Sequence, residues 1–267
     1  MFTLSKRLEA VCRLIPRTRV LGDIGCDHGY ISVSAVEAGM AERAIAADVN
    51  KGPLERAMGN IAEADLENLI ETRLSDGLAG LKPGECDTIV IAGMGGPLMR
   101  RIIEDGVDKI SEETRLVLQP QSDIPAFRKW LRLGGSHIEA EDIVFEDGKY
   151  YPMMRVRLGE KILRGEFCAA AGTFSQKEQT ADSPAFAATL RDTAEEQMML
   201  DAFGPLLLYM RHPVLKEYME YQSRTDESAR RGILKSKDPQ QKEENLEQLK
   251  MRERLRKRAL SWYDEDT

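Results

Sequence analysis

Short apolar runs alternate with amphipathic, helix-length stretches through roughly the first 160 residues of the chain. The apolar runs of strand length are Val20–Ile24, Ala44–Asp48, Ile70–Leu74, Thr88–Ala92, Arg115–Gln119, Ile138–Phe145 and Met153–Leu158. The helix-length stretches between the earlier runs are Tyr30–Ala38, Pro53–Ala64, Pro97–Glu104 and Ile124–Leu133. This strand–helix–strand repeat predicts a parallel sheet covered by helices.

The last two apolar runs have no helix between them. They are joined by residues 146–149, and the Asp147-Gly148 pair there favours a tight hairpin turn. A parallel sheet that ends in an antiparallel hairpin is typical of the class I methyltransferase fold, whereas a plain dinucleotide-binding fold more often ends on another crossover helix. We therefore predict an α/β fold, a Rossmann-like class I methyltransferase domain with a seven-stranded, mostly parallel sheet.

The pattern changes after about residue 184. Apolar residues recur at helical spacing over 185–222 and 238–262, which predicts two long helices packed as a pair and joined by a polar linker near 223–237. Residues 175–183 are polar and are predicted to link the two parts. The predicted domains are therefore residues 1–165, which carry the sheet, and residues 166–267, which are helical.

Charge is unevenly distributed along the chain. The formal net charge is −7, but residues 223–260 hold twelve Lys and Arg against seven Asp and Glu, a local +5. A basic segment on an acidic body fits an RNA-binding appendage, and it fits equally a helical pair with solvated charges. The candidate RNA contacts in this segment are Arg224, Arg230, Arg231, Arg254 and Arg258.

Composition argues against several other classes of protein. The four cysteines are scattered and there are three histidines, so we expect no metal site. No apolar run is long enough to cross a membrane, and the charged N-terminal stretch does not resemble a secretory signal. We expect a cytoplasmic protein that is a monomer and binds neither a membrane nor a metal.

The first apolar run leads into a Gly-x-x-x-Gly turn and then a helix. Glycines such as Gly25 let the backbone turn tightly and approach a ligand. A dinucleotide site uses this turn to receive a pyrophosphate, but here Asp23, Asp27 and His28 stand where the phosphates would lie. Carboxylates repel a pyrophosphate and attract a cation, so the turn predicts S-adenosylmethionine, with its sulfonium and ammonium groups, as the cofactor.

Further candidate contacts follow the next strands. Asp48, with Val49 and Asn50, closes the second apolar run, where a carboxylate can accept hydrogen bonds from both ribose hydroxyls. Asp76-Gly77 follows the third run and can meet the adenine amine. Because the carboxyl ends of parallel strands share one crevice, these acids are predicted to lie together.

Small residues end the fourth run. Ala92, Gly93 and Met94 are predicted to contact the cofactor, and Gly95 and Gly96 to allow a flat target base to approach. The Asn-Pro-Pro-Tyr motif of many amino-methyltransferases is absent here. Gln119 and Pro120, after the fifth run, form a second candidate contact for the base.

These motifs together resemble one known family. The matching segments are Leu4 to Leu8, Asp23 to Tyr30, Ile91 to Gly96, Leu118 to Pro120 and Phe203 to Pro205. They are similar to the bacterial tRNA (adenine-22-N1)-methyltransferases. The resemblance implies a class I methyltransferase domain followed by a coiled-coil-like helical domain, with methylation of N1 of adenine 22 in the D-arm region of tRNA.

If that resemblance holds, the reaction chiefly requires alignment. Adenine N1 has a lone pair, so its attack on the sulfonium methyl needs no prior deprotonation, and the reacting atoms must lie in line about 3 Å apart. Asp27 is the candidate either for stabilising the cation that develops on adenine or for binding the cofactor's amino group. Tyr30 is expected to stack on or orient the base, and His28 to shape the pocket.

Other functions fit part of the pattern. A class I methyltransferase acting on another RNA or a small molecule would share the whole cofactor site. A non-catalytic RNA-binding protein with a decayed methyltransferase fold is a second alternative, although none of Asp23, Gly25, Asp48 and Asp76 is missing. A dehydrogenase is disfavoured by the acidic turn.

Overall fold

The computed structural model describes residues 3–166, 193–235 and 238–264. The chain divides into two compact units, residues 1–181 and 182–267. The predicted linker at residues 175–183 and the fourth cysteine, Cys168, lie outside the described residues. The predicted domain boundary at 165/166 adjoins the same segment and stays a prediction.

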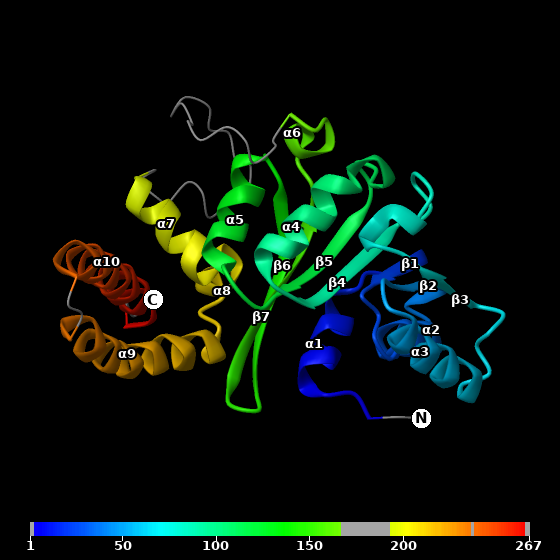
Figure 1. Cartoon of the computed structure of the whole chain (residues 1–267), viewed down its shortest axis with the longest axis horizontal. Helices are drawn as coiled ribbons and strands as arrows, with labels where there is room; N and C mark the ends of the chain where they lie inside the picture. The colour runs from blue at the N-terminus through cyan, green and yellow to red at the C-terminus, as the bar shows by residue number, and fades with distance from the viewer. Residues whose placement is uncertain (1–2, 167–192, 236–237, 265–267) are drawn as a thin grey trace. The chain divides into compact units, whose positions relative to one another are not determined.

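The first unit is built on a seven-stranded sheet with the strand order β3-β2-β1-β4-β5-β7-β6 (Figure 1). The strands are β1 (Thr18–Ile24), β2 (Ala41–Asp48), β3 (Ile70–Leu74), β4 (Thr88–Met94), β5 (Arg115–Pro120), β6 (His137–Glu146) and β7 (Lys149–Arg157). All the pairings among β1 to β5 are parallel, and β7 runs antiparallel to both β5 and β6. The predicted mostly parallel sheet is confirmed.

The hairpin between β6 and β7 turns where the sequence predicts it. Asp147 and Gly148 have φ angles of 48° and 77°. Two successive positive φ angles are characteristic of the type I′ turn, which Asp-Gly favours because its twist matches that of the flanking strands. The turn brings the hairpin tip to the edge of the sheet at which the parallel strands end (Figure 1).

Helices cover both faces of this sheet. They are α1 (Lys6–Leu14), α2 (Tyr30–Glu37), α3 (Lys51–Glu63), α4 (Gly96–Asp105), α5 (Ile124–Leu133) and the short α6 (Glu160–Leu163), with 3-10 turns at Gly77–Gly80 (η1) and Val107–Lys109 (η2). Apolar residues of α1 to α3 pack in one buried cluster, and those of α4 and α5 pack in another. The helix α1 is absent from the sequence prediction; Ser5 caps it by accepting the Leu8 amide at 3.3 Å.

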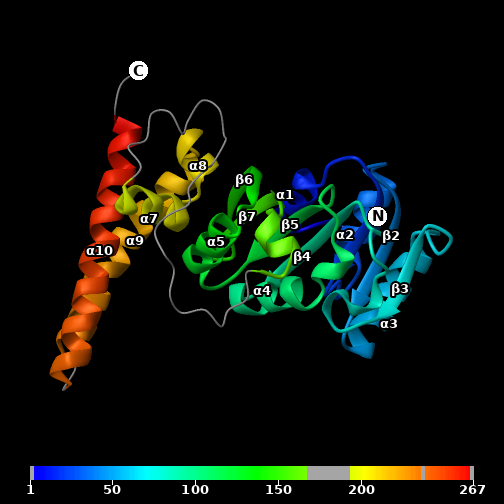
Figure 2. The same ribbon diagram turned by 90° about the horizontal axis from the view of Figure 1, so that it is seen from above.

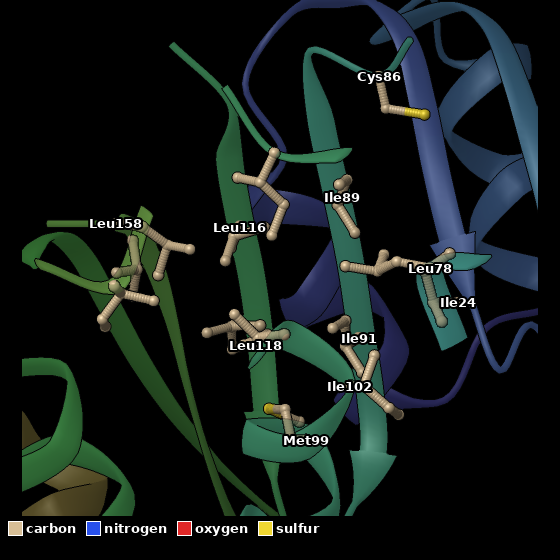
Figure 3. Packing of buried hydrophobic residues seen from close by; sticks show 14 of the residues in the cluster. Ile24, Leu78, Cys86, Ile89, Ile91, Met99, Ile102, Leu116, Leu118 and Leu158 are labelled. Carbon is tan, nitrogen blue, oxygen red and sulfur yellow. The ribbon is translucent and has the colours of Figure 1, made fainter. Parts of the chain in front are cut away.

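The strands are apolar on both faces because each face meets a helical layer. In β4, Ile89 and Ile91 belong to the cluster under α4 and α5 (Figure 3), whereas Val90 between them belongs to the cluster under α1 to α3. Successive side chains of a strand point to opposite faces, so a continuous apolar run is what a strand covered on both sides requires.

The second unit is helical in its described part. Its helices are α7 (Ala194–Phe203), α8 (Pro205–Tyr209), α9 (Pro213–Leu234) and α10 (Pro239–Asp264). The two long helices α9 and α10 lie side by side (Figure 1), and Figure 2 shows α10 as one continuous rod. Their packing includes a buried ion pair between Asp226 and Arg256, whose Oδ2 and Nη1 atoms are 2.6 Å apart.

The polar linker predicted at 223–237 is wrong for most of its length. Residues 223–234 continue α9, and α10 begins at Pro239. The polarity of this stretch reflects an exposed helix surface, because Arg, Glu and Ala sustain a helix whether or not they are buried. The breaks fall instead at Gly204-Pro205 and at Pro213, which open α8 and α9.

Candidate active site

The turn between β1 and α2 is closed by backbone hydrogen bonds to the next strand. The amides of Gly25 and Cys26 donate to the Ala47 carbonyl at 2.8 and 3.0 Å. Gly25 has a φ of 72°, and a Cβ there would lie 2.2 Å from the Met94 methyl carbon. The positive φ therefore disfavours a residue with a side chain at this position, and a Cβ there would also displace the end of the Met94 side chain.

Asp23 ends β1 beneath this turn and is 3% exposed. Its Oδ2 atom accepts hydrogen bonds from the Ser32 hydroxyl at 2.8 Å and the Ser32 amide at 3.3 Å, which fixes the first turn of α2. Burial raises the pKa of Asp23 to about 6, the Ser32 hydrogen bonds lower it, and the nearby Asp48 carboxylate raises it slightly.

Asp48, at the end of β2, is hydrogen-bonded to residues of three loops. Its Oδ1 accepts the Asn50 amide at 2.8 Å and its Oδ2 accepts the Asp27 amide at 3.4 Å, while its carbonyl accepts the Ser75 amide at 2.9 Å. Each carboxylate oxygen has a second lone pair, which a hydroxyl of a ligand can use. Val49 and Asn50 are exposed beside it.

The ends of β1, β2 and β3 form one edge, as the strand order requires. Asp76 follows β3 and is exposed, with Gly77 after it at a φ of 55°. Parallel strands bring these carboxyl ends together, so Asp23, Asp48 and Asp76 occupy adjacent strand ends.

Asp27 lies in the turn with its side chain 60% exposed and is paired with a cation. The Arg56 Nη2 atom of α3 donates to Asp27 Oδ1 at 2.7 Å, and His28 Nε2 lies 3.7 Å from Oδ2. The His28 and Tyr30 rings stack on each other with centroids 5.1 Å apart. The turn therefore presents the Asp27 carboxylate and the stacked rings of His28 and Tyr30 at one edge of the sheet.

The loop after β4 packs against the loop after β5. Gly96 donates its amide to the Ser122 carbonyl at 3.1 Å, and Gln121 donates to the Met94 carbonyl at 2.8 Å. A Cβ on Gly96 would meet the Ser122 carbonyl oxygen at 2.7 Å, and one on Gly95 would meet its hydroxyl at 2.9 Å. Gly96 is thus required by the packing of the loops, whatever ligand lies above it, whereas a side chain on Gly95 would displace only the Ser122 hydroxyl.

Gln119 is fully buried at the end of β5, with Pro120 also buried beside it. Its Oε1 accepts the Gly93 amide at 3.1 Å and the Arg7 Nη1 group of α1 at 3.1 Å. Sequence reasoning omitted Arg7 from the site, although the Leu4–Leu8 segment belongs to the motifs of the family resemblance. The capping serine, Ser5, is the signal that could have placed a helix, and with it Arg7, at this edge.

The five predicted RNA contacts of the helical unit fall into two groups. Arg230 pairs with Glu253 at 2.6 Å, Arg254 lies 3.5 Å from Glu195, and Arg258 pairs with the buried Glu196. Arg224 and Arg231 are exposed on α9, and the described part of the chain gives neither an ion pair. Arg230, Arg254 and Arg258 therefore form ion pairs that stabilise the unit itself. The positive charges of Arg224 and Arg231 are not balanced by a described carboxylate.

Two further features bear on the kind of site. Within residues 3–166, 193–235 and 238–264, no cluster of His, Cys, Asp and Glu is arranged to hold a metal ion. None of the helices described combines the length and apolar composition that a membrane span requires.

Comparisons with known proteins place this geometry in a family. Residues 4–154 match the model of a methyltransferase domain. The Bacillus subtilis tRNA (adenine(22)-N(1))-methyltransferase is 40% identical over 158 residues, which are 59% of this chain and 66% of that protein, so the alignment spans just under two thirds of its length. The crystal structure of the B. subtilis M1A22 tRNA methyltransferase TrmK superposes with a TM-score of 0.77 at 30% identity, covering 97% of this chain and 99% of that one.

The chain belongs to the tRNA (adenine-22-N1)-methyltransferase family. A second solved structure in this group, the Streptococcus pneumoniae protein Sp1610 in complex with S-adenosyl-L-methionine, has a TM-score of 0.72 at 28% identity and covers 95% of this chain and 99% of that one. The match includes the helical unit, because it extends well beyond the methyltransferase domain.

The residues present fit the cofactor that such a fold uses. A nucleoside needs an acceptor for its ribose hydroxyls, and Asp48 offers free lone pairs at the end of β2. A sulfonium and an ammonium need negative surroundings, which Asp27 and Asp76 supply on the adjoining loops, with Asp23 buried in β1 beneath them. The positive φ of Gly25 keeps the backbone accessible.

Proposed function

We propose that this protein transfers the methyl group of S-adenosylmethionine to N1 of adenine 22 in tRNA. The observation that carries the proposal is the match with an M1A22 tRNA methyltransferase over 97% of this chain, helical unit included. A chain that shared only its cofactor domain with that enzyme would leave the substrate open. Because this chain shares the helical unit as well, the match supports the same substrate.

The acidic strand ends form the cofactor side of the proposed site. Asp48 accepts the ribose hydroxyls, Asp76 and Gly77 meet the adenine of the cofactor, and the loop of Ala92, Gly93 and Met94 flanks its methionine part. Val49 and Asn50 border the ribose. Bound S-adenosylmethionine supplies an electrophilic methyl group, and these residues fix its direction.

Asp27 belongs with the cofactor in this proposal. Its amide binds Asp48 at 3.4 Å, which places it over the end of β2, and Arg56 already balances part of its charge. A carboxylate paired in this way is better suited to the cofactor's ammonium than to a cation developing on adenine. Asp23, held by Ser32, positions the turn from beneath.

The target adenine enters beside the stacked His28 and Tyr30 rings and above Gly95 and Gly96. N1 needs no general base, so the residues here act by orientation and by excluding water. Adenine N1 lies on the Watson–Crick edge, and exposing it costs a few kcal/mol that stacking and phosphate contacts offset. Gln119 and Pro120, both buried, support the loop that receives the base.

The cellular setting follows from the substrate. A tRNA-modifying enzyme that uses S-adenosylmethionine works in the cytoplasm, where both reactants are found. The second unit contributes tRNA contacts, and one chain suffices for the reaction, so a monomer is proposed.

Transfer of a labelled methyl group tests the proposal. The purified chain is incubated with labelled S-adenosylmethionine and an unmodified tRNA carrying adenine 22, alongside the same tRNA with guanine 22. Label is expected in the first tRNA and only background in the second. Equal labelling of both, or of neither while calorimetry shows cofactor binding, would reject adenine 22 as the target.

A further inference from the structure

Arg7 is a cation held at the edge of the sheet without a carboxylate partner. It lies half-buried on α1, where Nη1 donates to the neutral amide oxygen of Gln119 and the guanidinium lies 5.5 Å from the centroid of the Tyr151 ring. No described Asp or Glu lies within ion-pair distance of it. By contrast Arg13, on the same helix, pairs with Asp142 at 3.2 Å.

The support beneath Arg7 is rigid. Gln119 is fully buried and its oxygen also accepts the Gly93 amide. The guanidinium is therefore held in a fixed position relative to the ends of β4 and β5. The N-terminus of α1 is fixed as well, since the Lys6 amide donates to Glu146 at 2.6 Å. Gly93 lies directly below, because a Cβ there would be 3.6 Å from Nη1.

This arrangement leaves part of the guanidinium available to a ligand. Gln119 uses one N–H of the five, and the guanidinium carbon lies over the Tyr151 ring, so the other four N–H groups have no hydrogen-bond partner among the described residues. A guanidinium stays protonated at any working pH and binds planar or tetrahedral oxyanions through two parallel hydrogen bonds. In a chain of formal charge −7, an uncompensated cation at this edge points to an anionic ligand.

Two anions belong to the reactants, the carboxylate of S-adenosylmethionine and the backbone phosphates of the RNA. The acids assigned to the cofactor lie at the ends of β1, β2 and β3, whereas Arg7 lies over the ends of β4 and β5, beside β7, further along the same edge of the sheet. The adenine ring gains positive charge during methylation, so a guanidinium at its reacting edge would oppose the reaction. A phosphate of the same nucleotide carries the complementary charge.

We propose that Arg7 binds a backbone phosphate of the nucleotide whose base enters above Gly93 to Gly96, with Gln119 and Tyr151 as its positioning residues. The inference rests on the proposed function, since it requires an RNA substrate at this edge. It differs from the helical-unit contacts in acting on the reacting nucleotide itself.

The test compares R7Q and R7K with the matched control R13Q, which removes the same charge from the same helix. For R7Q, kcat/KM for tRNA is expected to fall about 10- to 100-fold, the loss typical of a charge-assisted hydrogen bond. The slope of log kcat/KM against log salt concentration should decrease by about 0.7 to 0.9, as for one phosphate contact. R7K should keep the wild-type slope and recover only part of the rate.

Binding of S-adenosylhomocysteine, measured by calorimetry, is expected to stay within about twofold of wild type in all three variants. That result also reports a folded site. If R7Q proves unfolded, R7K carries the test through a lowered kcat/KM at unchanged cofactor affinity. R13Q should match the wild type throughout.

Other outcomes overturn the inference. Weaker S-adenosylhomocysteine binding with an unchanged salt slope, and wild-type affinity for 5′-methylthioadenosine, which lacks the carboxylate, would assign Arg7 to the cofactor. Wild-type kinetics in R7Q would leave Arg7 with a structural role. Absence of methyl transfer by the wild-type chain would instead refute the proposed function, and the inference with it.

Discussion

Asp23 shows how a single side chain links the fold to the site. It lies at the end of β1, is 3% exposed and is hydrogen-bonded to Ser32 in the first turn of α2. Burial disfavours its charged form, which raises the pKa of the carboxyl from its ordinary value of 3.8 to about 6. The folded state therefore binds a proton more tightly than the unfolded state does.

The sign of the resulting pH dependence is testable with Asp23→Asn. Because the folded pKa is raised, the stabilisation from Asp23 is complete below pH 4 and is lost as the pH rises through about 6. The free energy of unfolding of the wild type should therefore fall relative to that of D23N, by roughly 2 kcal/mol between pH 4 and pH 7. Urea denaturation at several pH values measures this difference. Parallel pH profiles for the two proteins would contradict the assignment.

The acidic residues of the site could be predicted from the sequence, whereas the position of the cation Arg7 could not. Asp23 and Asp48 lie at the ends of apolar runs and Asp76 follows one, so a rule about the ends of parallel strands places them together without knowledge of any side-chain contact. Arg7 is separated from Gln119 by 112 positions, and no local pattern predicts that pairing. The Arg56 partner of Asp27 was likewise missed, because it depends on how α3 packs beside the turn.

At the scale of secondary structure, α9 illustrates where periodicity misleads. The polar stretch after residue 222 was predicted as a linker, yet α9 extends to Leu234. Its surface is polar because one side packs against α10 and the other faces solvent. The strands and their hairpin were predicted closely, since burial on both faces and an Asp-Gly turn leave strong local signals.

The exposed side of α9 carries a prediction of its own. Arg224 and Arg231 are seven residues apart, so they lie on nearly the same side of the helix, and neither has an ion-pair partner among the described residues. The double variant R224Q/R231Q should weaken tRNA binding and lower its salt slope by about 1.5, with cofactor affinity unchanged. Filter binding across a salt series measures both quantities.

The double variant R230Q/R254Q is the matched control for that experiment. It removes the same charge from arginines that are already paired with Glu253 and Glu195. Its effect on the salt slope should be clearly smaller. Equal effects of the two double variants would indicate a general charge effect. No effect of either would show that this side of α9 is a solvated surface that does not contact tRNA.

For the molecule as a whole, the proposed substrate rests on more than the cofactor domain. The acidic strand ends are shared by many methyltransferases, and they explain why the sequence alone left another RNA or a small molecule open. The structural match extends over 97% of the chain and includes the helical unit, which supports a large, anionic substrate. The chemistry at the edge of the sheet then has to select one atom of one nucleotide.

The most direct test is to map the methyl group within the product tRNA. Methylation at N1 blocks the Watson–Crick edge, so reverse transcription of tRNA treated with the protein and S-adenosylmethionine should arrest at position 22, and its digest should contain 1-methyladenosine by mass spectrometry. Untreated tRNA should show neither signal. Methylation at another adenine atom such as N6, or arrest at a different position, would contradict the account.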